Sequence, residues 1–273
     1  MLGRLIRHEF RATGRIMLPL LAAELILAVL AGFSVRGLAR MEDMSFLRSM
    51  YVMTLIVFGL GMFAIAVVAF VLMIQRFYRS LLRDEGYLSM TLPVTVDAQI
   101  WAKLLSSFVW FIAVGALFFL SMFVVMSIGS YITLPDQEEL LEMLHAMREA
   151  LRELGVGSMI LYLLEMAAVV FFGICATCLR CYASMAIGCS AADHKLLLSF
   201  VAYFLIGIAL GMVANAAAFA VLPHMDAAYF YERIPADRLM HVVMLGNLIV
   251  EAGLSALFYF VTRYFLQNRL NLA

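Results

Sequence analysis

Hydrophobic and polar positions along this chain form long blocks rather than short alternations. Six apolar runs are each long enough to cross ~30 Å of hydrocarbon, which takes roughly 20 helical residues. The runs are 16–33, 51–74, 104–132, 156–179, 196–223 and 239–262. Because lipid offers the backbone no hydrogen-bond partner, the runs should be helices. The pattern predicts an all-α membrane protein with six transmembrane helices.

Composition and charge agree with this class. The chain is 65% hydrophobic and 14% charged, against about 25% charged in soluble domains, and its mean hydropathy is +0.99. Zero net charge predicts no nucleic-acid partner. With the N-terminus inside, 12 of the 19 Lys and Arg residues fall in cytoplasmic segments, as the positive-inside rule requires. We therefore expect a multi-pass protein of the plasma membrane with both termini cytoplasmic.

Residues 1–15 have a pattern of their own. Arg4, Arg7, Arg11 and Arg15 recur at helical spacing, with apolar side chains opposite. This predicts a cytoplasmic amphipathic elbow helix that lies on the inner leaflet; a positive-inside anchor for the first span explains the same residues. The remainder, 16–273, is predicted to form one six-helix transmembrane domain.

The loop between the third and fourth runs contains helix signals. Asp136 precedes Glu139 by three residues, a spacing typical of a capping box, and Gly155 is a plausible stop. The sequence predicts an extracellular amphipathic helix over 136–154. Such a helix rests on the outer surface, forms a dimer contact or gates a substrate.

Three glutamates lie near the middle of apolar runs: Glu24, Glu165 and Glu251. An acidic charge at that depth costs about 2.5–3.5 kcal/mol on insertion scales, so these side chains should face the bundle interior or a wet cavity. They either line a substrate pathway or form hydrogen bonds between helices.

Metal and nucleotide motifs are not found in the sequence. Cys175, Cys178 and Cys181 have iron–sulfur spacing, but on a helix they spread along one side and cannot wrap a cluster. We predict buried, reduced thiols, no metal site and no cofactor. The only lysines, Lys103 and Lys195, do not stand in a Walker A motif, so ATP hydrolysis would need another chain.

The polar segment 75–103 separates the second and third runs and is the most distinctive stretch. Arg79 and Arg83 continue the preceding helix, Gly86 ends or bends it, and Pro93 enforces a break. Apolar side chains between Gly86 and Pro93 offer anchors. The segment favours a contact with another protein, although a solvated loop explains it too.

This segment resembles the signature region of ABC-2 type ABC transporter permeases. The resemblance rests on Glu85-Gly86-Tyr87-Leu88 followed by Leu92-Pro93, and on the layout of an N-terminal elbow and six spans. It implies a non-catalytic membrane subunit of an ATP-driven exporter for an amphipathic or hydrophobic substrate. It also implies an ABC ATPase subunit that binds ATP and Mg, and a second permease subunit in a homo- or heterodimer. The implied partner-coupling residues are Arg79, Arg83, Asp84, Glu85, Gly86, Tyr87, Leu88, Leu92 and Pro93.

Two other functions remain open from the residues alone. One is a standalone secondary transporter driven by protonation of the buried glutamates. The other is an intramembrane enzyme that uses those carboxyls, although no Glu-Glu or His motif stands beside them in the sequence.

Overall fold

The computed structural model is helical wherever it assigns regular structure. It describes residues 2–40, 45–82, 95–129, 141–142, 145, 148–149, 156–191, 194–221 and 236–268, and none of them is in a β-strand. Six helices within these ranges are long and apolar enough to cross a membrane. For the described residues, the prediction of an all-α chain with six helices able to span a membrane is therefore confirmed.

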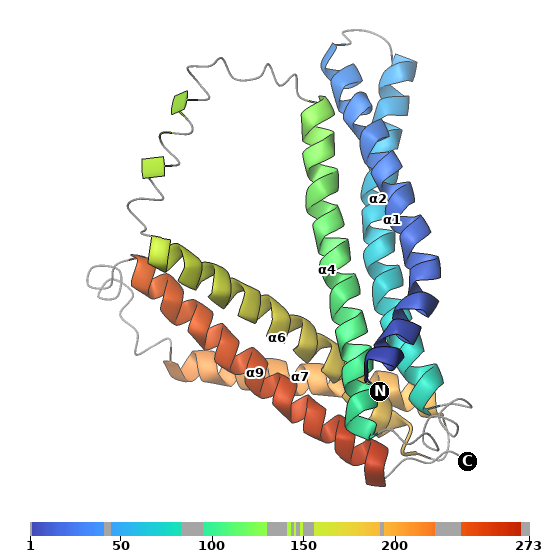
Figure 1. Ribbon diagram of the computed structural model, residues 1–273, viewed down its shortest axis with the longest axis vertical. Helices are drawn as coiled ribbons and strands as arrows, with labels where there is room; N and C mark the ends of the chain where they lie inside the picture. Colours follow the sequence, from blue (N-terminus) through green and yellow to red (C-terminus); the bar gives the residue numbers. More distant parts are fainter. Residues whose placement is uncertain are drawn as a thin grey trace. The chain divides into compact units, whose positions relative to one another are not determined.

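Each helix extends beyond its apolar run at one end or at both ends; the helices are drawn in Figure 1. Their bounds are α1 Leu2–Arg40, α2 Ser45–Phe77, the π-helix η1 Tyr78–Leu82, α4 Val96–Gly129, α6 Val156–Gly188, α7 Lys195–Val221 and α9 Ala236–Asn268. A helix rises 1.5 Å per residue, so even α7, with 27 residues, is long enough to span the hydrocarbon.

The boundary predicted at residue 15 does not appear in the structure. Residues of the expected elbow and of the first span form the single 39-residue helix α1, which contains Pro19. Whether its basic start lies on a membrane surface stays a prediction. Of the expected 136–154 helix, the five described residues are helical and exposed, and the others lie outside the described residues.

The chain divides into two compact units. Unit 1 comprises residues 1–73 and 105–156, and unit 2 comprises 74–104 and 157–273. Helices α2 and α4 each contribute residues to both units. The predicted single transmembrane domain thus contains two separately packed bodies.

Unit 1 packs α1 against α2 and α4. Ala28 and Ala31 of α1 form a buried cluster with Phe58 of α2. Gly32 and Gly129 allow α1 and α4 to approach closely: a Cβ on Gly32 would stand 2.7 Å from Ile128 Cβ, and one on Gly129 would stand 2.8 Å from Val35. Small residues at such crossings are the usual means of packing helices in lipid.

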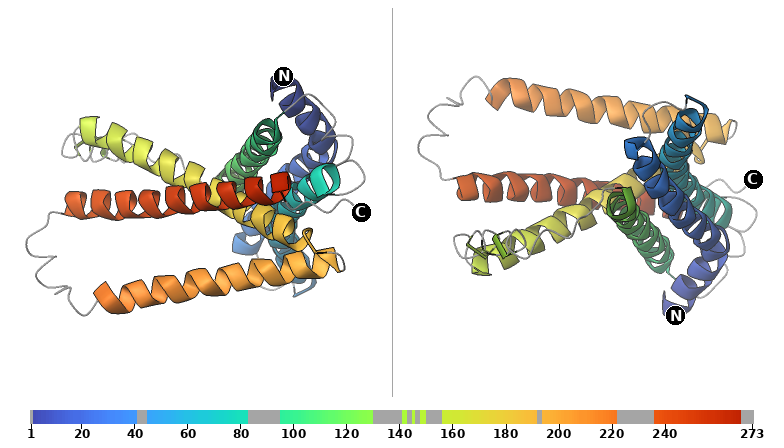
Figure 2. Two further views of the ribbon diagram at one scale, coloured as in Figure 1. Left: turned by 90° about the horizontal axis from the view of Figure 1, so that it is seen from below. Right: turned by 90° about the horizontal axis from the view of Figure 1, so that it is seen from above.

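Unit 2 is organised around α6. The Ser255 hydroxyl of α9 donates to the Phe172 carbonyl of α6 at 3.2 Å, and Figures 1 and 2 show these two helices side by side. The cytoplasmic half predicted for α6 supplies much of the core, including Tyr182 and all three of its cysteines. These cysteines are free thiols in the structure, as predicted.

Candidate functional site

Of the predicted coupling residues, the structure describes one. Arg79 lies exposed on η1. Residues Arg83, Asp84, Glu85, Gly86, Tyr87, Leu88, Leu92 and Pro93 lie outside the described residues. Residues 83–94 are called the 83–94 segment below. The contacts that position this segment lie in the described residues on either side of it.

The first end is anchored to α6. Phe77, the last residue of α2, stacks on Tyr182 of α6 with ring centroids 3.9 Å apart and planes at 6°. Both side chains are 0% exposed. Leu81 and Leu82 of η1, immediately before the 83–94 segment, are buried as well. A π-helical turn of this kind is rare and is frequent at functional sites.

The second end is anchored to α9. The Thr95 hydroxyl accepts from the Ala98 amide at 3.3 Å, which caps the start of α4. Asp97, in the first turn, then accepts from the Tyr259 hydroxyl at 2.5 Å and from Arg263 Nε at 3.2 Å. A charge-assisted pair of contacts thus ties the start of α4 to α9.

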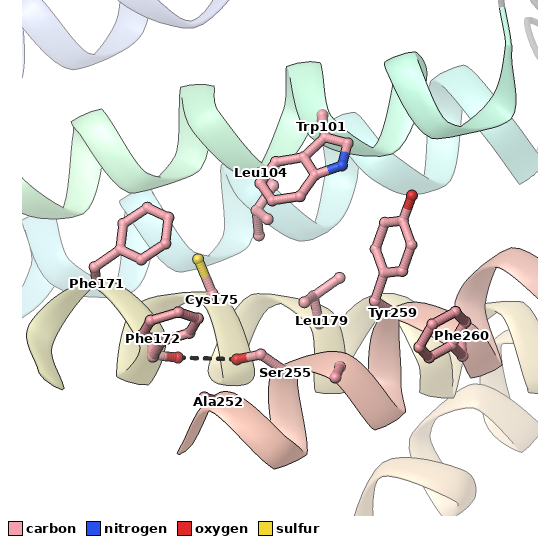
Figure 3. A pocket seen from close by; sticks show the side chains of 11 residues that line it. Trp101, Leu104, Phe171, Phe172, Cys175, Leu179, Ala252, Ser255, Tyr259 and Phe260 are labelled. Carbon is pink, nitrogen blue, oxygen red and sulfur yellow. Dashed lines mark hydrogen bonds between the residues drawn. The ribbon is translucent and has the colours of Figure 1, made fainter. Parts of the chain in front are cut away.

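A cavity of about 270 Å³ lies beside this second anchor (Figure 3). Its lining comes from α4, α6 and α9 of unit 2 and comprises Trp101, Leu104, Phe171, Phe172, Cys175, Leu179, Ala252, Ser255, Ala256, Tyr259 and Phe260. The cavity has about the volume of the smallest ligand pockets, ~300 Å³. It is suited to the hydrophobic part of a ligand.

Tyr259 belongs to both the cavity and the anchor. Its ring lines the cavity and lies 6.1 Å from the Trp101 ring. Its hydroxyl points toward α4 in Figure 3 and donates to Asp97. Any displacement of the start of α4 would therefore alter the wall of the cavity directly.

Cys189 and Lys195 stand at the junction of α6 and α7. Burial raises the pKa of the Cys189 thiol, against Lys195 and a hydrogen bond with Ser199, which both lower it. Nearby, Arg180 of α6 donates to the Tyr203 hydroxyl of α7 and stacks over its ring at 4.5 Å. The two helices are therefore packed together at this junction. Because burial raises the pKa of the Cys189 thiol, we expect it to be unreactive.

The three predicted pathway glutamates have different surroundings. Glu24 lies in unit 1, whereas Glu165 and Glu251 lie in unit 2. Glu165 Oε2 shares a hydrogen bond of 2.7 Å with His241 Nδ1, and Tyr162 stacks on the imidazole at 4.0 Å. Glu251 is half-buried. Within unit 2 the structure supports inter-helix bonding for Glu165, which was one of the two expectations.

Sequence reasoning missed His241, Asp97, Tyr259 and Arg263 as members of a site. Asp97 and Tyr259 are 162 positions apart, and no local spacing signals such a pair. A signal did exist for His241, since it is the only histidine within the six apolar runs. It stands one helical turn from the start of its span.

Taken together, the helices and their apolar length define a multi-pass helical membrane protein. Comparison with protein-family models, with curated proteins and with solved structures finds no match to this chain.

Proposed function

We propose that this chain is the permease subunit of an ATP-binding cassette exporter of the ABC-2 type. A separate ABC ATPase subunit would bind ATP and Mg, and a second permease subunit would complete the pore. The proposal starts from the resemblance of residues 85–93 to the signature region of that family and from the lack of a Walker A motif in the sequence. This chain would then transmit movement rather than catalyse hydrolysis.

The observation that carries the proposal is the double anchoring of the 83–94 segment in unit 2. Before the segment, Phe77 stacks on Tyr182 of α6. After it, Asp97 binds Tyr259 and Arg263 of α9. A partner protein that binds this segment would be connected on both sides to packed helices. A solvated connecting loop would require no such packing at either end.

Coupling would follow from these contacts. When two ATPase subunits close on ATP, the gripped segment would move and carry η1 and the start of α4 with it. Since Asp97 and Tyr259 are bonded, the start of α4 would shift against α9 and reshape the aromatic cavity. The ATPase thereby biases a conformational equilibrium through differential contacts.

The cavity supports a substrate with a hydrophobic part. Five aromatic side chains contribute to its wall, and the Ser255 hydroxyl is already bonded to the Phe172 carbonyl. An amphipathic or hydrophobic molecule fits this lining better than a polar one, because a polar group buried there would lose its bonds with water.

Crosslinking tests the ATPase contact. A cysteine replacing Tyr87 should crosslink to a co-purifying ATPase in native membranes. The four native cysteines are buried, so they should contribute little background. The matched control is a cysteine replacing the exposed Leu141, in the loop predicted to face outside, which should give no such product.

Export and ATPase assays test the coupling between ATP hydrolysis and transport. Tyr87→Ala and Gly86→Pro should abolish substrate export while leaving ATPase activity and the membrane fold intact. The proposal fails if the purified chain carries no ATPase and transports without ATP, or if both variants export at the wild-type rate.

A further inference from the structure

Glu24 is a buried acid that forms no hydrogen bond with the described part of the chain. It is 1% exposed, and its Oε1 forms no hydrogen bond with any described residue. Its Oε2 lies against Gly61 of α2, where an added Cβ would overlap the carboxyl group. Gly61 therefore leaves the room that this carboxyl occupies.

Ser121 of α4 is a second buried polar group with no partner among the residues that the structure describes. Its side chain is 0% exposed, and its Oγ forms no hydrogen bond in the described structure. Other hydroxyls in unit 1, such as Ser34 and Thr54, bond to the carbonyl four residues earlier. Ser121 does not satisfy itself in this way.

The packing of α1 and α4 places these two orphan groups at one level. The helices run parallel, with Thr13 bonded to Trp110 and Gly32 against Ile128. Glu24 is eight residues before Gly32 on α1. Position 120, next to Ser121, is eight residues before Ile128 on α4.

The neighbouring layer supports this register. The layer contains Ala28, Ala31 and Phe58, with Val124 and Val125 packed on them. One helical turn earlier on each of α1 and α4 are Glu24 and Ser121, and Gly61 is one turn from Phe58 on α2. Because Ser121 is fully buried, its hydroxyl faces the interior at the level of the carboxyl group.

We propose that Glu24 and Ser121 form a proton-binding site inside unit 1, in which Glu24 carries an exchangeable proton and, after a change of side-chain rotamer, donates it in a hydrogen bond to Ser121 Oγ. The proton comes from water and returns to it, so no other reactant is required. One donor and one acceptor then satisfy both orphan atoms at once.

The charges around the site favour a proton over an ion pair. Residues 49–73 of α2 and 105–129 of α4 contain no Asp, Glu, Lys, Arg or His. On α1 the nearest cations, Arg15 and Arg36, stand nine and twelve positions away, roughly 13 and 18 Å along the helix. Tyr51 is the nearest titratable group on α2, about as far away as Arg15. A metal cation would need more oxygen ligands than one carboxyl and one hydroxyl.

Dicyclohexylcarbodiimide, which adds to protonated carboxyls in apolar surroundings, tests the site without any transport assay. In the purified chain, mass spectrometry should find the reagent on Glu24 at neutral pH and progressively less of it at alkaline pH. Ser121→Ala should lower the pH of half-labelling by about half to one unit, because one hydrogen bond to the neutral acid is lost.

Two glycines on the same helix give a matched control. Gly61→Ala places a methyl group on the carboxyl and should change the labelling profile, whereas Gly59→Ala, which has open space around it, should not. Glu24→Gln should fold and lose the label on that peptide.

Three results would overturn the proposal. They are an unlabelled Glu24 in the folded chain, a profile that Ser121→Ala leaves unchanged or shifts to higher pH, and protection by Na⁺ at constant pH, which would indicate a metal ion. The site does not depend on the exporter assignment, since no ATPase enters the measurement.

Discussion

At the scale of single residues, the buried acids are the most informative side chains. An ionised carboxylate in hydrocarbon must neutralise or find a partner. Glu165 has one in His241, at 2.7 Å, whereas Glu24 has none among the described residues. Two glutamates that both lie near the middle of apolar runs therefore have different surroundings, and only the packing distinguishes them.

The Glu165–His241 pair should hold α6 to α9. His241→Ala leaves a buried carboxyl without its partner, and we expect a loss of about 1–3 kcal/mol of stability. Thermal unfolding in detergent measures this loss. Adding Glu165→Gln to that variant should restore part of the stability, because an amide costs less to bury without a partner than a group that can carry a charge.

The control for this pair is Met240→Ala, which removes an exposed side chain beside His241 on the same helix. It should leave the unfolding temperature nearly unchanged. Additive effects of the Glu165 and His241 substitutions would show that the pair contributes no coupling energy.

At the scale of elements, the end of α2 is the unusual feature. Most of α2 exposes large apolar side chains, as Phe63 does at 69%. One face of α2 is buried along its length, at Phe58, Ile65, Ala69, Met73 and Phe77, and in the π-helical η1 the consecutive residues Leu81 and Leu82 are both buried. Burial of consecutive residues after Phe77 marks the place where the helix becomes an anchored connection.

Phe77→Ala should therefore destabilise unit 2. Phe→Ala in a water-soluble core costs about 3–5 kcal/mol. In lipid the transfer contribution is smaller because the surroundings are apolar too, so we expect about 1–3 kcal/mol from lost packing against Tyr182. Chemical denaturation in mild detergent measures it. Phe63→Ala, on the same helix, should cost almost nothing, and equal losses at both positions would contradict the anchor.

At the scale of the whole molecule, hydrophobic patterning predicts the number and approximate positions of the spans. A run of about 20 apolar residues has few alternatives to a transmembrane helix, and all six appear in the structure. The pattern does not predict the polar contacts between helices. Asp97 and Tyr259 meet only because α4 and α9 pack at one register, and Gly61 meets Glu24 for the same reason.

The elbow shows a different limit. A basic amphipathic face identifies residues that favour an interface, but it does not say where a helix ends. Arg15 and Ile16 are consecutive residues of one helix, which continues through the change from polar to apolar residues. The division into two units was likewise absent from the pattern, since the boundaries fall inside α2 and α4.

The orientation of the whole chain is the remaining prediction that a single measurement decides. The distribution of Lys and Arg predicts that the 83–94 segment is cytoplasmic and that residues 136–154 are outside. A membrane-impermeant maleimide should label a cysteine replacing Leu141 in intact cells. It should label a cysteine replacing Tyr87 only after permeabilisation. The native cysteines are buried, so the unsubstituted chain supplies the background. The reverse labelling pattern would put the 83–94 segment beyond the reach of a cytoplasmic ATPase and remove the basis of the exporter proposal.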